Sequence, residues 1–429
     1  MKRVLMDKML SWKESRHRKP LLLWGARQVG KTWIMKEFGR LHYENTVYIS
    51  FYNNSRMRRI FDDDYDVHRI ISAIEINLHV TIHPDRSLLI FDEVQSAPRV
   101  VEALKYFCED APTYHVMAAG SLLGVALHEG ISFPVGKVDE LHLYPLSFRE
   151  YLMAQGEERL AAALNDYSSR EIRDHSERYK ELLKEYYAIG GMPEVVSRFV
   201  EDRDFSEARD IQLSIVNQYE GDFGKHVKET ELPRIRMVWN ALPAQLAKEN
   251  KKFFFGQIRK GARHKEFETA IQWLVDAGIV YRVNKVTKPA MPLKSYTDFS
   301  AFKLFMIDVG LLGAMSELDM ESVLTGNDVF TEFKGALSEQ YVHQQLISDT
   351  GYTPYYYSGD KSTYETDFMI QKGKNVVPLE VKSEVSLKSK SLRVFCEKFK
   401  PEKAIRISSA DYMDQGWMMN VPLWAVSSI

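Results

Sequence analysis

The most constraining feature of the sequence is a glycine-bounded stretch between the apolar run Leu21–Trp24 and a segment, 33–38, with helix-compatible spacing. The stretch consists of Gly25, Ala26, Arg27, Gln28, Val29, Gly30, Lys31 and Thr32. A strand, a loop of this kind and a helix together wrap backbone N–H groups around a polyphosphate. Lys31 then supplies a mobile positive charge for the β- and γ-phosphates, and the Thr32 hydroxyl suits Mg²⁺. The stretch predicts a P-loop that binds ATP and Mg²⁺.

A second stretch, Ser87–Glu93, has the pattern of a buried strand that ends on two carboxylates. ATP hydrolysis by a P-loop protein uses one acid in the Mg²⁺ shell and another that polarises water. We assign Asp92 to the metal shell and Glu93 to the general base. The alternative, a glycine-bearing turn that merely happens to end in Lys-Thr, does not explain these carboxylates.

Strand and helix patterns alternate along the first 120 residues, which predicts an α/β fold with a parallel sheet covered on both faces. Strands are expected at Thr46–Phe51 and His115–Ala119, and helices at Val67–Leu78 and 101–107. Ser121 follows the strand expected beside the Asp92 strand, where it could touch the γ-phosphate or the attacking water. A cap of the following turn explains Ser121 equally well.

Composition limits the remaining possibilities. A chain of 429 residues predicts two to four domains. Its two cysteines, Cys108 and Cys396, lie far apart in sequence, which disfavours a disulfide scaffold or zinc module and favours a reducing compartment. Without a signal-peptide pattern or a membrane-length apolar run, we expect a cytoplasmic protein. The net charge of −2 means that affinity for nucleic acid requires a local basic patch.

Further motifs give the sequence a resemblance to a known protein family. Gly120-Ser121 is followed by Leu143-Tyr144-Pro145-Leu146-Ser147-Phe148, then Arg149 and Glu150. Together with the P-loop and Asp92-Glu93, they resemble a family of prokaryotic AAA+ ATPases. In that family the ATPase domain is joined to a C-terminal domain of uncharacterised function with a restriction-endonuclease-like core. The family often has Arg after Gly136, but here the residue is Lys137, so Arg149 is the fallback for an arginine finger.

The resemblance and the patterns give four parts. They are an AAA+ P-loop ATPase domain (1–155), a helical lid or linker (156–228), a winged-helix-like domain (229–300), and a restriction-endonuclease-like domain (301–429). Gly190-Gly191-Met192-Pro193-Glu194 resembles a family signature, and we expect it to be a tight turn between helices.

Between Lys251 and Lys294 the sequence has ten lysines and arginines but only three acids, and this local excess of positive charge favours DNA as a partner. A winged helix that only packs against other domains remains nearly as well supported, because the expected recognition helix carries Glu266, Glu268 and Asp276.

A second candidate site lies near the C-terminus, in two strand patterns at 364–370 and 376–382 with a turn at Lys372–Asn375 between them. A turn centred between residues 373 and 374 places Asp367 opposite Glu380, and Lys382 shares the face of Glu380. Two carboxylates with Glu339 from the preceding helix could hold Mg²⁺, and the lysine could activate water. A solvated strand edge produces the same Glu-x-Lys pattern.

These patterns predict an ATPase that couples ATP binding and hydrolysis to DNA engagement. They leave open whether it also cleaves DNA in a metal-dependent reaction. The alternative is a nucleotide-dependent switch or scaffold whose C-terminal domain only binds a protein or nucleic acid. A small-molecule kinase would need neither Glu93 nor the C-terminal segments.

Overall fold

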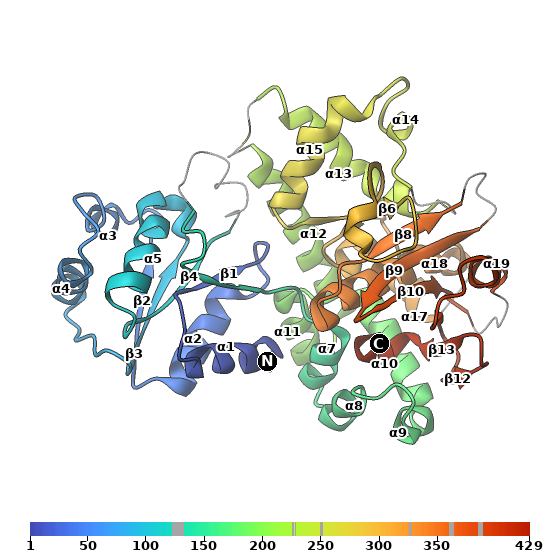
Figure 1. The fold of residues 1–429 in the computed structure, drawn as a ribbon, viewed down its shortest axis with the longest axis horizontal. Helices are drawn as coiled ribbons and strands as arrows, with labels where there is room; N and C mark the ends of the chain where they lie inside the picture. Colours follow the sequence, from blue (N-terminus) through green and yellow to red (C-terminus); the bar gives the residue numbers. More distant parts are fainter. Residues whose placement is uncertain are drawn as a thin grey trace. The chain divides into compact units, whose positions relative to one another are not determined.

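The computed structural model describes residues 1–121, 133–224, 227, 229–248, 252–325, 328–359, 364–384 and 389–429, and the chain forms two compact units (Figure 1). We call Arg3–Tyr144 with Asp276–Gly278 the P-loop unit. Met1–Lys2, Pro145–Val275 and Ile279–Ile429 form the C-terminal unit. Among the helices of these described residues, none is long and apolar enough to cross a membrane.

The P-loop unit is built on a five-stranded parallel sheet with the order β2-β3-β4-β1-β5. Its strands are β1 (Leu21–Trp24), β2 (Asn45–Ser50), β3 (Ser87–Asp92), β4 (His115–Ala119) and β5 (Asp139–His142). Its helices are α1 (Leu5–Glu14), α2 (Lys31–His42), α3 (Ser55–Arg59), α4 (Val67–Leu78) and α5 (Pro98–Asp110). The predicted α/β fold of a P-loop NTPase with a parallel sheet is therefore confirmed.

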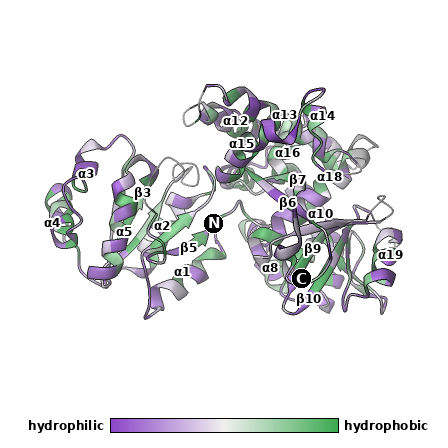
Figure 2. Cartoon of the chain, turned by 45° about the horizontal axis from the view of Figure 1, so that its top comes forward, coloured by the Kyte–Doolittle hydropathy of each residue, from purple (hydrophilic) through white to green (hydrophobic). Residues whose placement is uncertain are grey.

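Buried strands and amphipathic helices explain this arrangement. All six residues of β3 are buried, as expected for a strand in the interior of a parallel sheet. The helices carry both hydrophilic and hydrophobic residues (Figure 2). α4 buries Val67, Ile70 and Ile74 in the hydrophobic core of the P-loop unit. Its start is fixed by Asp66, whose side chain accepts the backbone N–H of Arg69.

The C-terminal unit combines a helical part with a mixed sheet of the order β12-β13-β11-β10-β9-β8-β6-β7. Its first helices are α7 (Phe148–Ala154), α8 (Glu158–Ala163), α9 (Arg170–Asp174), α10 (Ser176–Ile189), α11 (Pro193–Asp202), α12 (Phe205–Phe223), α13 (Leu232–Leu246), α14 (Phe255–Ile258) and α15 (His264–Asp276). The later ones are α16 (Val309–Met315), α17 (Met320–Thr325), α18 (Asp328–Gln345) and α19 (Lys390–Phe399). The strands are β6 (Val280–Val286), β7 (Thr297–Met306), β8 (Tyr355–Ser358), β9 (Glu365–Lys372), β10 (Asn375–Val381), β11 (Ile405–Ser408), β12 (Met413–Asp414) and β13 (Met419–Pro422).

The last part of the expected winged-helix-like domain (229–300) belongs to this large sheet. β6 pairs with β7 on one side and, at Lys285, with Tyr356 of β8 on the other. The expected boundary between residues 300 and 301 consequently falls inside β7. The division into four parts stays a prediction.

The strand pairing predicted for the second site is confirmed. Asn375 pairs with Lys372 across a two-residue turn, and the antiparallel register continues to Leu379 and Phe368. The next positions in this register are Glu380 and Asp367. The turn position therefore determines which side chains of β9 and β10 meet.

The Gly190-Gly191 motif is more than a helix breaker, because it packs directly against a buried acid. Gly190 ends α10 with φ +73° and ψ −164°, a conformation that is essentially restricted to glycine. The N–H of Gly191 donates to Oδ2 of Asp308 at 2.6 Å, and Asp308 is completely buried. A Cβ atom on Gly190 would lie 2.1 Å from Oδ1 of Asp308. The motif therefore joins α10 to the end of β7.

We predict that Gly190→Ala destabilises the C-terminal unit by about 3 kcal/mol, because it adds a steric overlap to an unfavourable backbone conformation. Gly156→Ala is the matched control, since Gly156 also has a positive φ, +81°, but no atom lies within 4 Å of its added Cβ. The shift of the midpoint of thermal unfolding measures both effects. Equal shifts for the two variants would contradict the role assigned to the Gly190–Asp308 contact.

Candidate functional site

The predicted P-loop adopts a looped backbone between β1 and α2. Gly25 and Gly30 have φ values of +151° and +94°, and Gln28 between them also has a positive φ. A Cβ atom on Gly25 would lie 2.4 Å from the carbonyl oxygen of Leu143. Glycine is therefore required at position 25 by backbone conformation and by space. Gly25, Ala26, Arg27, Gln28, Val29 and Gly30 form the loop, and Lys31 and Thr32 begin α2.

Lys31 is held over this loop by neutral partners. Its Nζ donates to the carbonyl oxygens of Gly25 at 2.8 Å and Ala26 at 2.7 Å. Burial lowers the pKa of Lys31 to about 8, against the opposing effect of Glu93 and Asp92. A buried ammonium bound to carbonyl dipoles gains further stabilisation when a phosphate group approaches it.

Thr32 and Asp92 lie together, as the sequence predicts. Oγ1 of Thr32 donates to Oδ2 of Asp92 at 2.5 Å, and the hydroxyl of Tyr48 donates to the same oxygen at 3.1 Å. The N–H of Glu93 donates to the other oxygen, Oδ1, at 3.0 Å. These hard oxygen donors suit Mg²⁺, and the hydroxyl and carboxylate that would share the ion are already adjacent. The P-loop site thus fits the metal that its motif implies.

Glu93 is fixed by two polar side chains. Its backbone is in the left-handed region, with φ +58°, directly after β3. Nε2 of Gln95 donates to Oε2 of Glu93, and Oγ of Ser121 donates to Oε1 at 3.4 Å. Ser121 comes two residues after the end of β4, which lies between β3 and β1. Ser121 therefore reaches the carboxylate assigned to the base.

Sequence reasoning missed two neighbours of these acids. Tyr48 lies on β2 in register with Ile90 of β3, and its alternating strand pattern suggested only packing. Gln95 comes two residues after Glu93, and a Cβ atom on Gly120 would lie 2.5 Å from its Oε1. The Gly-Ser pair after β4 was a usable signal, because glycine there leaves room for the Gln95 amide.

The two residues considered for an arginine-finger role have other partners within their own units. Nζ of Lys137 lies 2.8 Å from Oε1 of Glu109. Arg149, in α7, donates to the carbonyl oxygen of Leu164 at 2.9 Å and to Oδ1 of Asn165 at 2.7 Å. Neither interaction points to a phosphate ligand.

At the second site, the predicted residues lie close together. Oδ2 of Asp367 accepts the N–H of Val381 at 2.7 Å, and Nζ of Lys382 lies 3.1 Å from Oε1 of Glu380. Burial tends to lower the pKa of Lys382, but Glu380, Asp367 and Glu339 outweigh burial and raise it. All three acids therefore act electrostatically on Lys382.

The structure adds Lys303 of β7, which is 1% exposed. Its Nζ lies 3.0 Å from Oε1 of Glu365 and 3.9 Å from Oε2 of Glu339. Burial disfavours the charge of Lys303, but Glu339, Glu365 and Asp367 outweigh burial and raise its pKa. The run of apolar residues around Lys303 suggested a plain core strand, so sequence reasoning did not include it.

Glu339, Asp367 and Glu380 do not fit a divalent metal ion in this arrangement. Across the described ranges, no three or more His, Cys, Asp or Glu side chains are grouped so that they could hold a metal ion. Two lysine ammonium groups lie among the carboxylates instead. This arrangement gives no support to the metal role predicted for the three acids, and the water-activating role of Lys382 stays a prediction.

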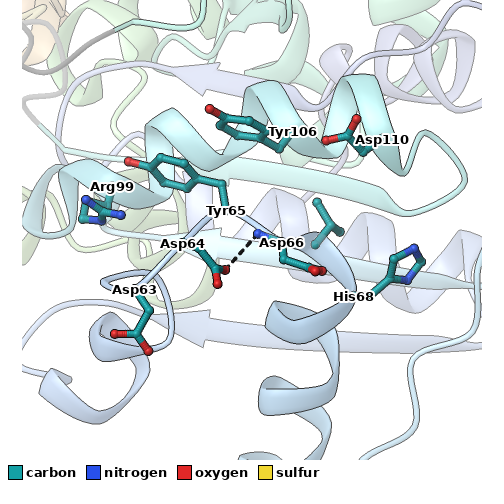
Figure 3. Close-up of a pocket in the computed structure, with 9 residues that line it drawn as sticks. Asp63, Asp64, Tyr65, Asp66, His68, Arg99, Tyr106 and Asp110 are labelled. Carbon is teal, nitrogen blue, oxygen red and sulfur yellow. Dashed lines mark hydrogen bonds between the residues drawn. The ribbon is translucent and has the colours of Figure 1, made fainter.

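A surface hollow on the P-loop unit contains none of the predicted site residues (Figure 3). Several acids line it, but its aromatic rings already pack together: Tyr65 stacks on Tyr106 with centroids 4.8 Å apart, and Arg99 lies over Tyr65. Asp64 accepts the backbone N–H of Asp66. Local packing and turn geometry account for these residues.

Three family models match separate segments of the chain. Residues 17–152 match an AAA domain, residues 180–322 match a domain of unknown function (DUF8612), and residues 334–424 match a domain of unknown function (DUF4143). The P-loop unit carries an AAA-type ATPase domain. This type of domain binds nucleotide, usually with Mg²⁺, and the geometry of Lys31, Thr32 and Asp92 agrees with it. No curated protein matches the chain.

Several solved structures are distantly similar. A Walker-type ATPase of Pyrococcus abyssi has 14% identity and a TM-score of 0.45, covering 73% of this chain and 95% of that one. The Orc1 protein of Aeropyrum pernix, solved in complex with DNA, has 13% identity and a TM-score of 0.29, covering 73% and 90%. A RuvB variant of Thermotoga maritima has 13% identity and a TM-score of 0.29, covering 65% and 88%.

We predict that Lys303→Met destabilises the C-terminal unit by roughly 3–5 kcal/mol, because it removes a buried cation that pairs with the buried Glu339 and the partly buried Glu365. Lys382→Met is the matched control, with an expected cost of about 1 kcal/mol, since the Lys382 side chain is 39% exposed. Chemical denaturation followed by circular dichroism compares the two variants. A larger loss for Lys382→Met would show that Lys303 is not the central cation of this cluster.

Proposed function

We propose that the protein binds ATP with Mg²⁺ at the P-loop, hydrolyses it, and couples the nucleotide state to DNA engagement by the C-terminal unit. The observation that carries the first part is the convergence of Lys31, the Thr32–Asp92 pair and Glu93 at the carboxyl ends of β1 and β3. This is the edge where an open parallel sheet binds its ligand.

Each residue has a separable role in this proposal. Backbone N–H groups of residues 25–32 bind the phosphates, and Lys31 exchanges its carbonyl partners for phosphate oxygens. Thr32 and Asp92 would hold Mg²⁺, which neutralises charge on the phosphates when it is bound.

Glu93 accepts a proton from the attacking water in this mechanism. Gln95 and Ser121 orient its carboxylate through the two hydrogen bonds that they donate. Gln95 is therefore proposed as a positioning residue. Ser121 keeps its proposed sensor role, because its hydroxyl lies beside the base.

DNA engagement is supported by exposed basic side chains around α14 and α15. They are Lys252, Arg259, Lys260, Arg263 and Lys265. Phe254 nearby is 62% exposed, and an aromatic side chain beside cations suits a base or sugar surface. Arg259 is partly neutralised by Glu266, with 3.0 Å between Nη2 and Oε2, so Lys260, Arg263 and Lys265 are the stronger phosphate contacts.

The family resemblance supports a winged-helix-like segment and a restriction-endonuclease-like core as the DNA-engaging parts. Cleavage of DNA stays a prediction, and the pairing of its carboxylates with lysines opposes a metal-dependent mechanism. A scaffold that binds a protein partner is the competing proposal. A cytoplasmic location is also proposed, from the two unpaired cysteines.

For the ATPase, we expect Lys31→Ala to abolish nucleotide binding and turnover, because the phosphates lose their cation. Glu93→Gln should retain binding and lower kcat by about 10²-fold or more, since only the base is removed. Lys8→Ala, an exposed change on α1, is the control. Calorimetry with ATP and a phosphate-release assay separate binding from turnover. Unchanged turnover in Glu93→Gln would refute the assignment of the base.

For DNA, we expect the triple variant Lys260→Ala, Arg263→Ala and Lys265→Ala to bind duplex DNA more weakly. The slope of log affinity against log salt should fall by about 0.9 for each lost phosphate contact. Fluorescence anisotropy over a salt series measures both quantities. The matched control replaces the exposed residues Arg159, Arg170 and Arg173 with alanine. If wild type binds no DNA at any salt concentration, the protein-partner proposal replaces this one.

A further inference from the structure

We propose that the ammonium group of Lys303 is a built-in cation of the C-terminal carboxylate cluster, where it takes the place of a divalent metal ion. The carboxylate cluster consists of Glu339, Glu365, Asp367 and Glu380. Removal of the ammonium group should convert the cluster into a divalent-cation site. The proposal depends on neither ATP hydrolysis nor DNA binding.

The position of Lys303 is the first observation. Its side chain enters the cluster from β7, which is separate from the β9–β10 hairpin and from α18, the elements that carry the predicted ligands. Nζ lies 3.0 Å from Glu365 and 3.9 Å from Glu339, and 4.9 Å from the ring centroid of Tyr356. With 1% of the residue exposed, water cannot replace these partners. The ammonium is a fixed part of the interior.

The remaining carboxylates also have protein partners. Oε1 of Glu380 lies 3.1 Å from Nζ of Lys382, and Oδ2 of Asp367 accepts the N–H of Val381. Glu339 and Asp367 act on the charges of both Lys303 and Lys382, so the two lysines share one set of acids. A divalent ion would have to compete with both ammonium groups for the same oxygens.

A third cation completes the charge balance. Arg406 of β11 is in register with Glu380 of β10 and is completely buried, and its Nε donates to Oδ1 of Asn420 at 2.8 Å. Glu380 also acts on the charge of Arg406. With Arg406 counted beside Lys303 and Lys382, the four carboxylates and three cations leave a net charge of −1. A divalent ion added to this set would leave a net positive charge in a poorly solvated place. Removal of the Lys303 ammonium both restores the charge deficit and vacates the space beside Glu339 and Glu365 that a metal ion needs.

An ordinary structural ion pair is the alternative, and it makes a different prediction. If the acids are arranged only for Lys303, its removal leaves part of their charge uncompensated and favours their protonated forms, and no metal affinity appears. If the acids form a metal-type set that the lysine fills, their hard oxygens bind a divalent ion once the ammonium is gone.

The test uses the full chain without nucleotide, with Asp92→Asn to remove the P-loop carboxylate, and Mn²⁺ as the probe. Free Mn²⁺ is followed by electron paramagnetic resonance, and thermal unfolding is recorded with and without Mn²⁺. In this parent, we expect Asp367→Asn to leave the amount of bound Mn²⁺ unchanged. We also expect Mn²⁺ to cause no shift in the midpoint of thermal unfolding. Adding Lys303→Met should give one bound Mn²⁺ per chain and raise the midpoint when Mn²⁺ is present.

The added Mn²⁺ site should disappear again when Asp367→Asn is combined with Lys303→Met. Lys382→Met is the control, because it removes the same charge but leaves the Lys303 ammonium between Glu339 and Glu365, so no Mn²⁺ site should form. If Lys303→Met does not fold alone, Mn²⁺ should restore its fold. A Mn²⁺ ion in the parent that depends on Asp367 overturns the proposal. So does a Lys303→Met variant that gains neither bound Mn²⁺ nor stability from it.

Discussion

The buried carboxylate of Asp308 fixes the centre of the C-terminal unit, because groups from distant parts of the sequence converge on it. It accepts the N–H of Gly191 at 2.6 Å, the N–H of Leu311 at 3.1 Å and Nε2 of Gln344 at 3.1 Å. Burial raises the pKa of Asp308, and these hydrogen bonds counteract that effect. A buried acid is tolerated only with such partners, so the position of each partner segment is specified together with the others.

The same interaction determines where the charged cluster forms. Asp308 follows β7, and α18 binds the end of that strand through Gln340, which exchanges hydrogen bonds with the backbone of Met306 at 2.9 and 2.7 Å. Glu339 is the neighbour of Gln340 on α18, and Lys303 lies three residues before Met306 on β7. Docking of α18 on β7 therefore brings Glu339 and Lys303 together, although no local motif relates them.

Local motifs explain what the sequence could predict. The loop at Gly25–Thr32, its strand and its helix are contiguous, so backbone preference and spacing were enough to locate them. The β9–β10 register followed from one turn, and it placed Asp367 and Glu380 in neighbouring positions. Gln95 was missed because it reaches Glu93 through a turn that the sequence did not predict. The roles of Lys303 and of Asp308, the partner of the Gly190-Gly191 motif, were missed because they arise from contacts between segments far apart in sequence. The inclusion of β6 and β7 in the large sheet has the same cause, since β8 follows only after α18.

Lys31 and Lys303 are both buried, and they show how partners decide what the same side chain can do. Lys31 donates to neutral carbonyl oxygens, and burial lowers its pKa. Its charge is under-compensated, so an incoming polyphosphate improves its surroundings. Lys303 lies among carboxylates that raise its pKa, so its charge is already compensated and a further anion has little to gain there. Exchangeable ligands are therefore expected at Lys31, whereas Lys303 serves to keep one set of acids together in the interior.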